Sequence, residues 1–202
     1  MKKWKSMLLS GIVSVVTGVQ LYAQSPMGAP EGMPDMSQIQ AQMQESMKIL
    51  PFLTAPIEDK TPLGKADIDK FIEAIKVHKQ ERDESSKKLE EGFKRAANVL
   101  KPGVSYDTFI AKAIELSGKK SELDAMAKKA GYGSALEEMI VSARITRAMA
   151  KIQMDKELAK VPEAQRPMMQ NMMGNSLGII DPADVAAVAP YADRLMSLLE
   201  SK

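Results

Sequence analysis

The sequence predicts an all-α protein, and three observations lead to that fold class. Apolar residues recur at helical spacing through most of the chain, as in Ile68, Phe71, Ile72 and Ile75. Ser, Asp, Gly and Pro residues stand where these helices are expected to begin and end. No segment shows the alternation of Val, Ile, Thr and aromatic residues that is typical of strands. We therefore expect an irregular bundle of about five to seven helices, preceded by a flexible N-terminal arm.

The N-terminal segment has the pattern of a secretory signal peptide. Lys2, Lys3 and Lys5 form a basic start, and an apolar run of 13 residues leads to an exit near Ala23. A membrane-spanning helix needs roughly 20 apolar residues, so an uncleaved anchor is the weaker alternative. We expect residues 1–23 to be removed, with cleavage after Ser25 as the other option, and the protein to be periplasmic or secreted without a transmembrane span.

Removing the signal changes what the composition implies. Cleavage would leave 179 of 202 residues and shift the net charge from +2 to −1, so the basic character gives no argument for nucleic-acid binding. The chain has no Cys and one His, His78, which excludes thiol chemistry and disfavours zinc or iron sites. No nucleophile, phosphate-binding or paired-carboxylate motif is recognisable. We therefore expect no enzyme and no cofactor; an unrecognised hydrolase is the least favoured alternative.

Residues 24–64 are expected to form a flexible, Pro- and Met-rich arm. Residues 24–35 hold three Pro and two Gly, a composition that cannot bury enough apolar surface to fold. An amphipathic helix with a Gln-rich polar face is predicted over about 37–49. Residues 51–64 contain three further Pro and are predicted to be loose, which would leave this helix tethered on both sides.

The body of the protein, residues 65–202, is expected to form one helical domain. Its first part, residues 66–100, has apolar positions at both ends and a charged middle. Because no Gly or Pro interrupts residues 66–91, the pattern favours one long helix with a solvated middle. The alternative is two helices parted near Ser85 and Ser86.

Start and stop signals locate the next three helices. Ser105 and Gly118 are suited to begin and end the first. Ser121 matches the start of a capping box and predicts a short helix that ends at the Gly-Tyr-Gly turn. Ser134 repeats this start signal for a helix that runs to about Lys160. Because that helix is apolar on more than one side, we expect it in the centre of the bundle.

The C-terminal part is predicted to contain two further helices. A short Met-rich helix is expected over 168–173, after Pro162 ends the long helix. Asp181 followed by Pro182 is the expected order at a helix start. The final helix, over about 183–199, contains a proline that should kink or split it.

Methionine is the compositional outlier, with 16 residues in the chain. The densest group, proposed here as a partner-binding site, is Met168, Met169, Met172 and Met173. Thioether side chains can fill gaps in a core, provide an adaptable apolar surface for partners, or bind Cu(I). We expect a non-enzymatic cell-envelope protein that binds another protein or peptide in a chaperone-like or scaffold role. The alternative is a periplasmic Cu(I)-binding or metal-handling protein.

A basic stripe is the second candidate site. Arg144, Arg147 and Lys151 follow one another at i, i+3 and i+7 on the predicted central helix. The stripe either receives an anion or a carboxylate from a neighbouring helix, or it is solvated with Lys151 paired to Asp155. His78, in the polar middle of its segment, is either a titratable base or a partly exposed helical position.

Overall fold

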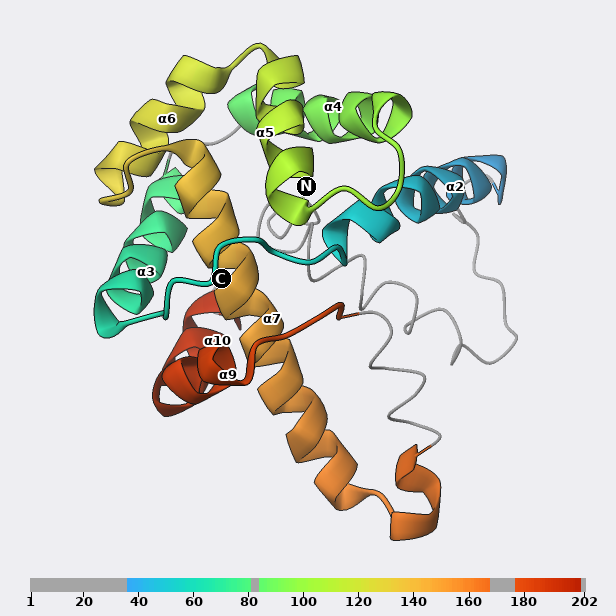
Figure 1. The fold of residues 1–202 in the computed structure, drawn as a ribbon, viewed down its shortest axis with the longest axis vertical. Helices are drawn as coiled ribbons and strands as arrows, with labels where there is room; N and C mark the ends of the chain where they lie inside the picture. The colour runs from blue at the N-terminus through green and yellow to red at the C-terminus, as the bar shows by residue number, and fades with distance from the viewer. Residues whose placement is uncertain (1–35, 81–83, 168–176, 201–202) are drawn as a thin grey trace, which may run out of the picture.

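The computed structural model describes residues 36–80, 84–167 and 177–200 of the chain (Figure 1). These residues form helices and no strand, which confirms the predicted all-α class. Seven helices are present in this part when α9 and α10 are taken as one kinked helix. The predicted signal peptide, residues 24–35 and the predicted helix over 168–173 lie outside the described residues.

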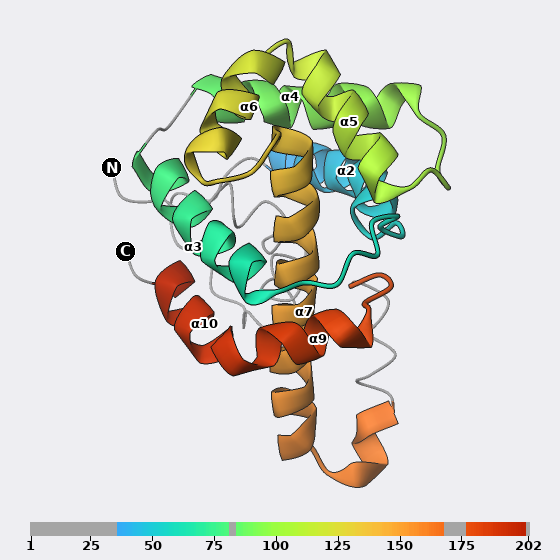
Figure 2. The ribbon, with the colours of Figure 1, turned by 60° about the vertical axis from the view of Figure 1, so that its left-hand side comes forward.

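Helix α7, Ala135–Lys160, is the central element, as predicted. The side chain of Ser134 caps it by accepting a hydrogen bond from the backbone N–H of Glu137 at 3.2 Å. Figure 2 shows α5 and α6 at one end of α7, with α3 and α9 packed against α7 and α10 beside α3. Ala143, Ile145 and Ala148 on α7 are fully buried, so the helix is enclosed around its middle.

The prediction of one long helix over 66–100 is wrong. The chain forms α3, Lys65–Gln80, and α4, Glu84–Val99, whose axes run in different directions (Figure 2). The apolar face of α3 contacts α6 and α7, whereas α4 contacts chiefly α5. The charged middle offers no apolar surface that would hold the two ends collinear. Each half therefore takes the direction in which its apolar face packs against neighbouring helices. The division precedes Ser85, which lies inside α4.

Helix α5, Tyr106–Ser117, begins at Ser105 and ends at Gly118 as predicted. It crosses α4 closely, because a Cβ atom on Gly92 of α4 would stand only 2.2 Å from the carbonyl oxygen of Ala113. Only glycine permits that approach of the two backbones. The close contact makes α4 and α5 a tightly joined pair at one end of the molecule (Figure 1).

The expectation that residues 51–64 are loose is also wrong. Helix α2, Met36–Leu53, continues through Pro51, and Phe52 is only 1% exposed. The Phe52 ring stacks on Phe109 of α5 with centroids 4.7 Å apart. Three of the apolar residues that follow α2 are also buried, namely Ala55, Ile57 and Leu63. This apolar burial outweighs the local preference of a Pro-rich segment for a loose conformation.

Helix α6, Lys120–Lys129, starts earlier than its capping-box pattern predicts. Ser121 lies exposed inside the helix, and the start at Lys119 has no side-chain cap. The backbone N–H of Lys119 donates to Ser117 Oγ at 3.1 Å, which ties the start of α6 to the end of α5. The short connection between the two helices therefore sets the boundary in place of Ser121.

The C-terminal helix is split at Pro190, as predicted. Helix α9, Pro182–Val188, is capped by Asp181, whose Oδ1 accepts from the N–H of Ala183 at 2.9 Å. The turn η3, Ala189–Tyr191, then leads into α10, Ala192–Glu200. A second short turn, η2, Glu163–Gln165, follows the end of α7.

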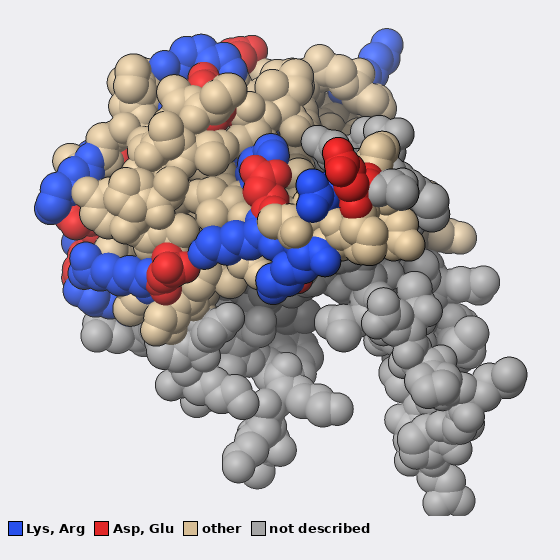
Figure 3. Space-filling view, turned by 90° about the horizontal axis from the view of Figure 1, so that it is seen from below, with Lys and Arg blue, Asp and Glu red and all other residues tan. Residues whose placement is uncertain are grey.

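The face of the molecule seen from below carries mixed charge. Viewed from below, Lys and Arg side chains lie beside Asp and Glu without forming a broad field of one sign (Figure 3). Over the described ranges, none of the helices combines the length and the apolar character needed to cross a bilayer.

Candidate functional site

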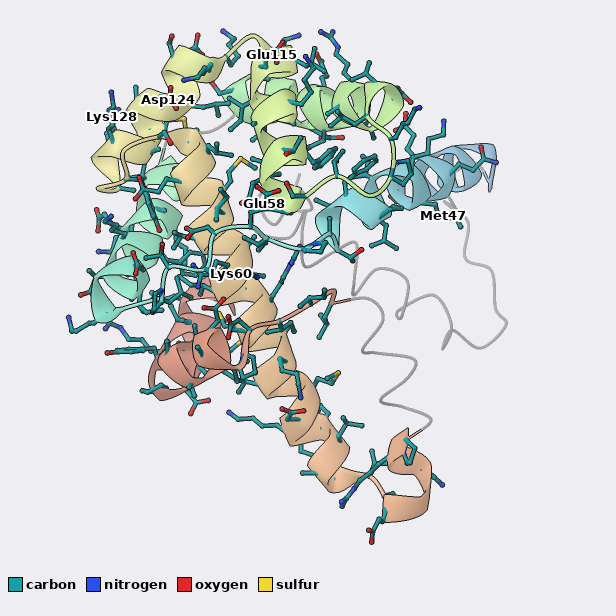
Figure 4. The ribbon with its side chains drawn as sticks, in the orientation of Figure 1. Met47, Glu58, Lys60, Glu115, Asp124 and Lys128 are labelled. Carbon is teal, nitrogen blue, oxygen red and sulfur yellow. The ribbon has the colours of Figure 1, made fainter. Side chains whose placement is uncertain are left out.

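The two arginines of the predicted stripe are buried, each about 5% exposed. Figure 4 shows the segment that carries Glu58 and Lys60 crossing α7. Backbone carbonyl oxygens of this segment and of the end of α2 accept hydrogen bonds from both arginines. Arg144 forms two hydrogen bonds with Asp184 of α9, from Nε at 2.9 Å and from Nη2 at 2.6 Å. Its Nη1 donates to the carbonyl oxygen of Thr61 at 2.7 Å. The hydrogen bonds to Asp184 raise the pKa of Arg144 above its usual value.

Arg147, one turn further along α7, has no such carboxylate in hydrogen-bond contact. Its Nη2 donates to the carbonyl oxygens of Leu53 and Ala55, the latter at 3.0 Å. Its guanidinium lies 5.1 Å from the centre of the Tyr106 ring. The buried Nη1 atom has no hydrogen-bond partner. Burial lowers the pKa of Arg147, against the attraction of Tyr106 and Asp107.

A small cavity of about 20 Å³ lies beside the two arginines. Exposed Lys60 and Ile179 form part of its wall, and buried Arg144 and Arg147 form another part. A volume of this size holds about one water molecule or one small polar group. The wall of the cavity therefore contains both buried arginines and residues exposed at the surface.

The other carboxylates that line the cavity already have partners. Asp59 accepts a hydrogen bond from the backbone N–H of Thr61 at 2.8 Å, and Asp181 caps α9. Although partial burial opposes it, the hydrogen bonds from Thr61 and the charge of Arg144 hold the pKa of Asp59 below its usual value. Asp184 forms an ion pair with Arg144. Of the two buried arginines, Arg147 is the one without a carboxylate in hydrogen-bond contact.

Lys151 is separate from this arrangement. It forms an exposed ion pair with Asp155, one turn along the same helix. The structure thus divides the predicted stripe: Arg144 receives a carboxylate from another helix, Arg147 is buried without one, and Lys151 is paired at i, i+4. A fully solvated stripe is not what forms.

His78 of α3 contacts a carboxylate that was not identified from the sequence. Its Nε2 lies against the carboxylate of Glu138 on α7, and the Glu138 side chain is only 9% exposed. The other ring nitrogen, Nδ1, is buried without a hydrogen-bond partner. This contact joins α3 to the first turns of α7.

Two acidic partners, Asp184 and Glu138, were therefore missed in the sequence. Each stands at helical spacing from buried apolar residues: Asp184 lies four residues before Val188, and Glu138 three before Val141. An acidic residue within an apolar helix face is a signal for a buried ion pair. The sequence of one helix alone does not indicate which residue of a neighbouring helix forms the pair.

The Met168, Met169, Met172 and Met173 cluster lies outside the described residues. Among the described methionines, Met126, Met149 and Met154 are buried and fill gaps in the core. Met47 differs, because 71% of its surface is exposed on α2 (Figure 4). Within the described ranges, no group of three or more His, Asp or Glu residues has a metal-binding arrangement.

Met47 and Ile179 belong to segments that meet. Gly178 sits so close to the end of α2 that a Cβ atom there would be 2.3 Å from the carbonyl oxygen of Thr54. Thr54 follows Met47 by seven residues, and its N–H still bonds to Leu50 at 3.0 Å in helical fashion. Met47 and Thr54 therefore share a helix face. Ile179, which is 67% exposed, is the next residue after Gly178.

Comparison with known proteins gives no relative for this arrangement. No family model, no curated protein and no solved structure matches the chain.

Proposed function

We propose that this is an exported, non-enzymatic protein of the cell envelope that binds another protein or peptide through exposed apolar side chains. The observation that carries the proposal is the exposure of Met47 and Ile179 on two segments that Gly178 holds together. Exposed side chains of this size on joined segments favour a contact with an apolar partner. The signal-peptide pattern of residues 1–23 supports the location.

The partner that suits this surface is a flexible segment carrying apolar residues. Met47 is unbranched and can adjust to different side chains, whereas Ile179 is rigid at χ1. Pro51, exposed four residues after Met47, extends the same face of α2 without a free N–H group. Gln44 and Lys48 are also exposed on α2 and place polar side chains along one side of this face.

Binding can be measured with a fluorescein-labelled, unstructured peptide rich in Leu and Phe. The double change Met47→Gln and Ile179→Gln should weaken binding about tenfold or more, since central apolar contacts each contribute more than about 1 kcal/mol. Val99→Gln is the matched control, because Val99 is 61% exposed but lies on α4. Equal affinity for the double variant and the control would contradict this surface.

The Cu(I)-binding alternative is distinguished by changing sulfur without changing apolar volume. Replacing Met168, Met169, Met172 and Met173 by Leu removes the thioethers and keeps the side chains apolar. Peptide binding should persist in this variant. A loss of Cu(I) binding under reducing conditions, together with no peptide binding by the original protein, would favour the metal-handling function instead.

Location is tested on the protein made in a bacterial host. We expect a mature form that starts at Gln24 and is released with the soluble envelope fraction, because Ala23 ends the signal pattern. Mass spectrometry of the N-terminal peptide checks the cleavage position. A full-length form that stays in carbonate-washed membranes would contradict export as a released protein.

A further inference from the structure

Met47 differs from the other methionines whose burial the structure describes. It is 71% exposed. The others are buried or partly buried, namely Met126, Met139, Met149, Met154 and Met196. An oxidant in solution reaches a thioether sulfur only where the side chain is accessible. Among these methionines, Met47 is therefore the one whose sulfur is open to oxidation in the folded protein.

The attachment of α2 to α4 explains why Met47 is exposed. Glu45, two residues earlier, forms an ion pair with Lys94 of α4, in which Glu45 Oε2 and Lys94 Nζ are 3.1 Å apart. Residues two positions apart in an α-helix point about 200° apart around its axis. Met47 therefore lies on the side of α2 that faces away from the contact with α4.

We propose that Met47 is a site of reversible oxidation that controls the binding of an apolar peptide. The control of binding rests on the proposed function, whereas the modification does not. The oxidant is hydrogen peroxide. A lone pair of the Met47 sulfur attacks one peroxide oxygen, the O–O bond breaks and a sulfur–oxygen bond forms. The other oxygen leaves with both protons as water, so the thioether loses two electrons to the peroxide and becomes a sulfoxide.

The sulfoxide makes this part of the surface polar. Its oxygen accepts hydrogen bonds from water, and these are lost when an apolar side chain of the peptide covers it. Oxidation therefore weakens binding at Met47, while Ile179 stays apolar. A methionine sulfoxide reductase reverses the change with a dithiol, which is oxidised to a disulfide while the sulfoxide oxygen leaves as water. Leucine at this position would provide apolar contact but no such control.

The modification is measured by mass spectrometry after treatment of the folded protein with hydrogen peroxide for a series of times. Cleavage at glutamate isolates Met47 in residues 46–58, and cleavage at lysine isolates Met154 in residues 152–156, each as the single methionine of its fragment. We expect Met47 to be oxidised at least about fivefold faster than Met154, and the two rates to become equal in urea. Equal rates in the folded protein would overturn the modification site.

The control of binding is measured with the fluorescein-labelled peptide after the peroxide has been removed. Oxidation should weaken binding about fivefold or more, and reductase with dithiothreitol should restore it. Met47→Leu, compared with its own affinity before treatment, should not respond to peroxide. The variant that replaces Met168, Met169, Met172 and Met173 by Leu should respond as the original protein does. A response that persists in Met47→Leu, or that is absent from the four-leucine variant, would assign the effect to another methionine and overturn the proposal.

Failure of the proposed function can be told apart from failure of the oxidative control. If the protein binds no peptide before oxidation, the proposed function is wrong and the control of binding with it, while the oxidation rates still decide whether Met47 is a modification site. If the protein binds the peptide equally before and after complete oxidation of Met47, the proposed function stands and the control is wrong.

Discussion

Arg144 and Asp184 form a buried ion pair that joins the middle of α7 to α9. Both side chains are only 5% exposed, and two N–H groups of the guanidinium meet the two carboxylate oxygens. Because α9 is a short helix, with buried Asp184 and Val188 on its inner face, this pair is a large part of its attachment. The pair also fixes one wall of the cavity beside Arg147.

Removing the carboxylate of this pair should strongly destabilise the protein. Asp184→Asn leaves the charge of Arg144 buried without its counterion, which costs about 3–5 kcal/mol in comparable pairs. Asp155→Asn is the matched control, because its ion pair with Lys151 lies at the surface, where such pairs contribute about 0–1 kcal/mol. Urea unfolding followed by circular dichroism measures both free energies. Similar values for the two variants would contradict a special role for the buried pair.

Gly178 should be difficult to replace for two separate reasons. Its φ of +71° is unfavourable for other residues, and a Cβ atom would lie 2.3 Å from the carbonyl oxygen of Thr54. Gly118 has nearly the same φ, +68°, but no atom within 4 Å of the Cβ position. Gly118→Ala should therefore cost about 1–2 kcal/mol from the backbone alone.

Gly178→Ala should cost more than Gly118→Ala, because the segment must also move away from α2. Overpacking of this kind adds about 1–3 kcal/mol. Thermal unfolding of the two variants measures the difference. The movement would also shift Ile179, so Gly178→Ala should weaken peptide binding while Gly118→Ala leaves it unchanged. Equal stability losses would show that the contact with Thr54 is unimportant.

Local signals in the sequence were sufficient for most helix boundaries. Ser105, Ser134 and Asp181 act as caps because their side chains bond to N–H groups two or three residues away. These bonds need no distant partner, so their positions can be read from the sequence. The split at Pro190 is predictable for the same reason.

Features that depend on distant contacts could not be predicted in this way. Phe52 is buried because Phe109 of another helix lies 4.7 Å away, and nothing near Phe52 in the sequence indicates this. The same holds for Asp184, which meets a residue 40 positions earlier. The basic stripe was recognised from its spacing, but spacing on one helix does not tell which members neighbouring segments will cover.

Asp124 should make the stability sensitive to acid. Hydrogen bonds from Lys120 and then from the backbone N–H of Ala135 lower its pKa below the ordinary value of 3.8. Because the folded pKa is the lower one, this contribution is complete above the unfolded pKa and is lost as pH falls through the folded pKa. Asp124→Asn should therefore destabilise the protein at neutral pH and approach the original protein in acid.

Urea unfolding at a series of pH values tests this expectation. Lys120→Gln is the informative comparison, because it removes the first cause and keeps the 2.9 Å hydrogen bond from Ala135 N to Asp124. Lys120→Gln should lower the free energy of unfolding less than Asp124→Asn does at neutral pH. Its difference from the original protein should also become smaller as the pH falls. A stability difference that stays constant from neutral pH to strong acid would show that Asp124 does not titrate as proposed.

Gly92→Ala reverses the usual effect of this substitution in a helix. Alanine normally stabilises an exposed helix interior over glycine by about 0.5–1 kcal/mol. At Gly92, however, the new Cβ would lie 2.2 Å from the carbonyl oxygen of Ala113, so α4 and α5 must separate. Neither backbone can yield as a flexible side chain would. We therefore expect a loss of about 1–3 kcal/mol, as in other overpacked sites.

Gly64→Ala provides the control, since its Cβ would be 3.8 Å from Asp67 Oδ2, an ordinary contact. That variant should change the free energy of unfolding by less than about 1 kcal/mol. The Phe93 and Phe109 rings, 5.8 Å apart across the two helices, report on the separation through near-ultraviolet circular dichroism. Gly92→Ala should alter this signal before unfolding begins. A stabilised Gly92→Ala protein with an unchanged aromatic signal would mean that helix propensity outweighs the close crossing of α4 and α5.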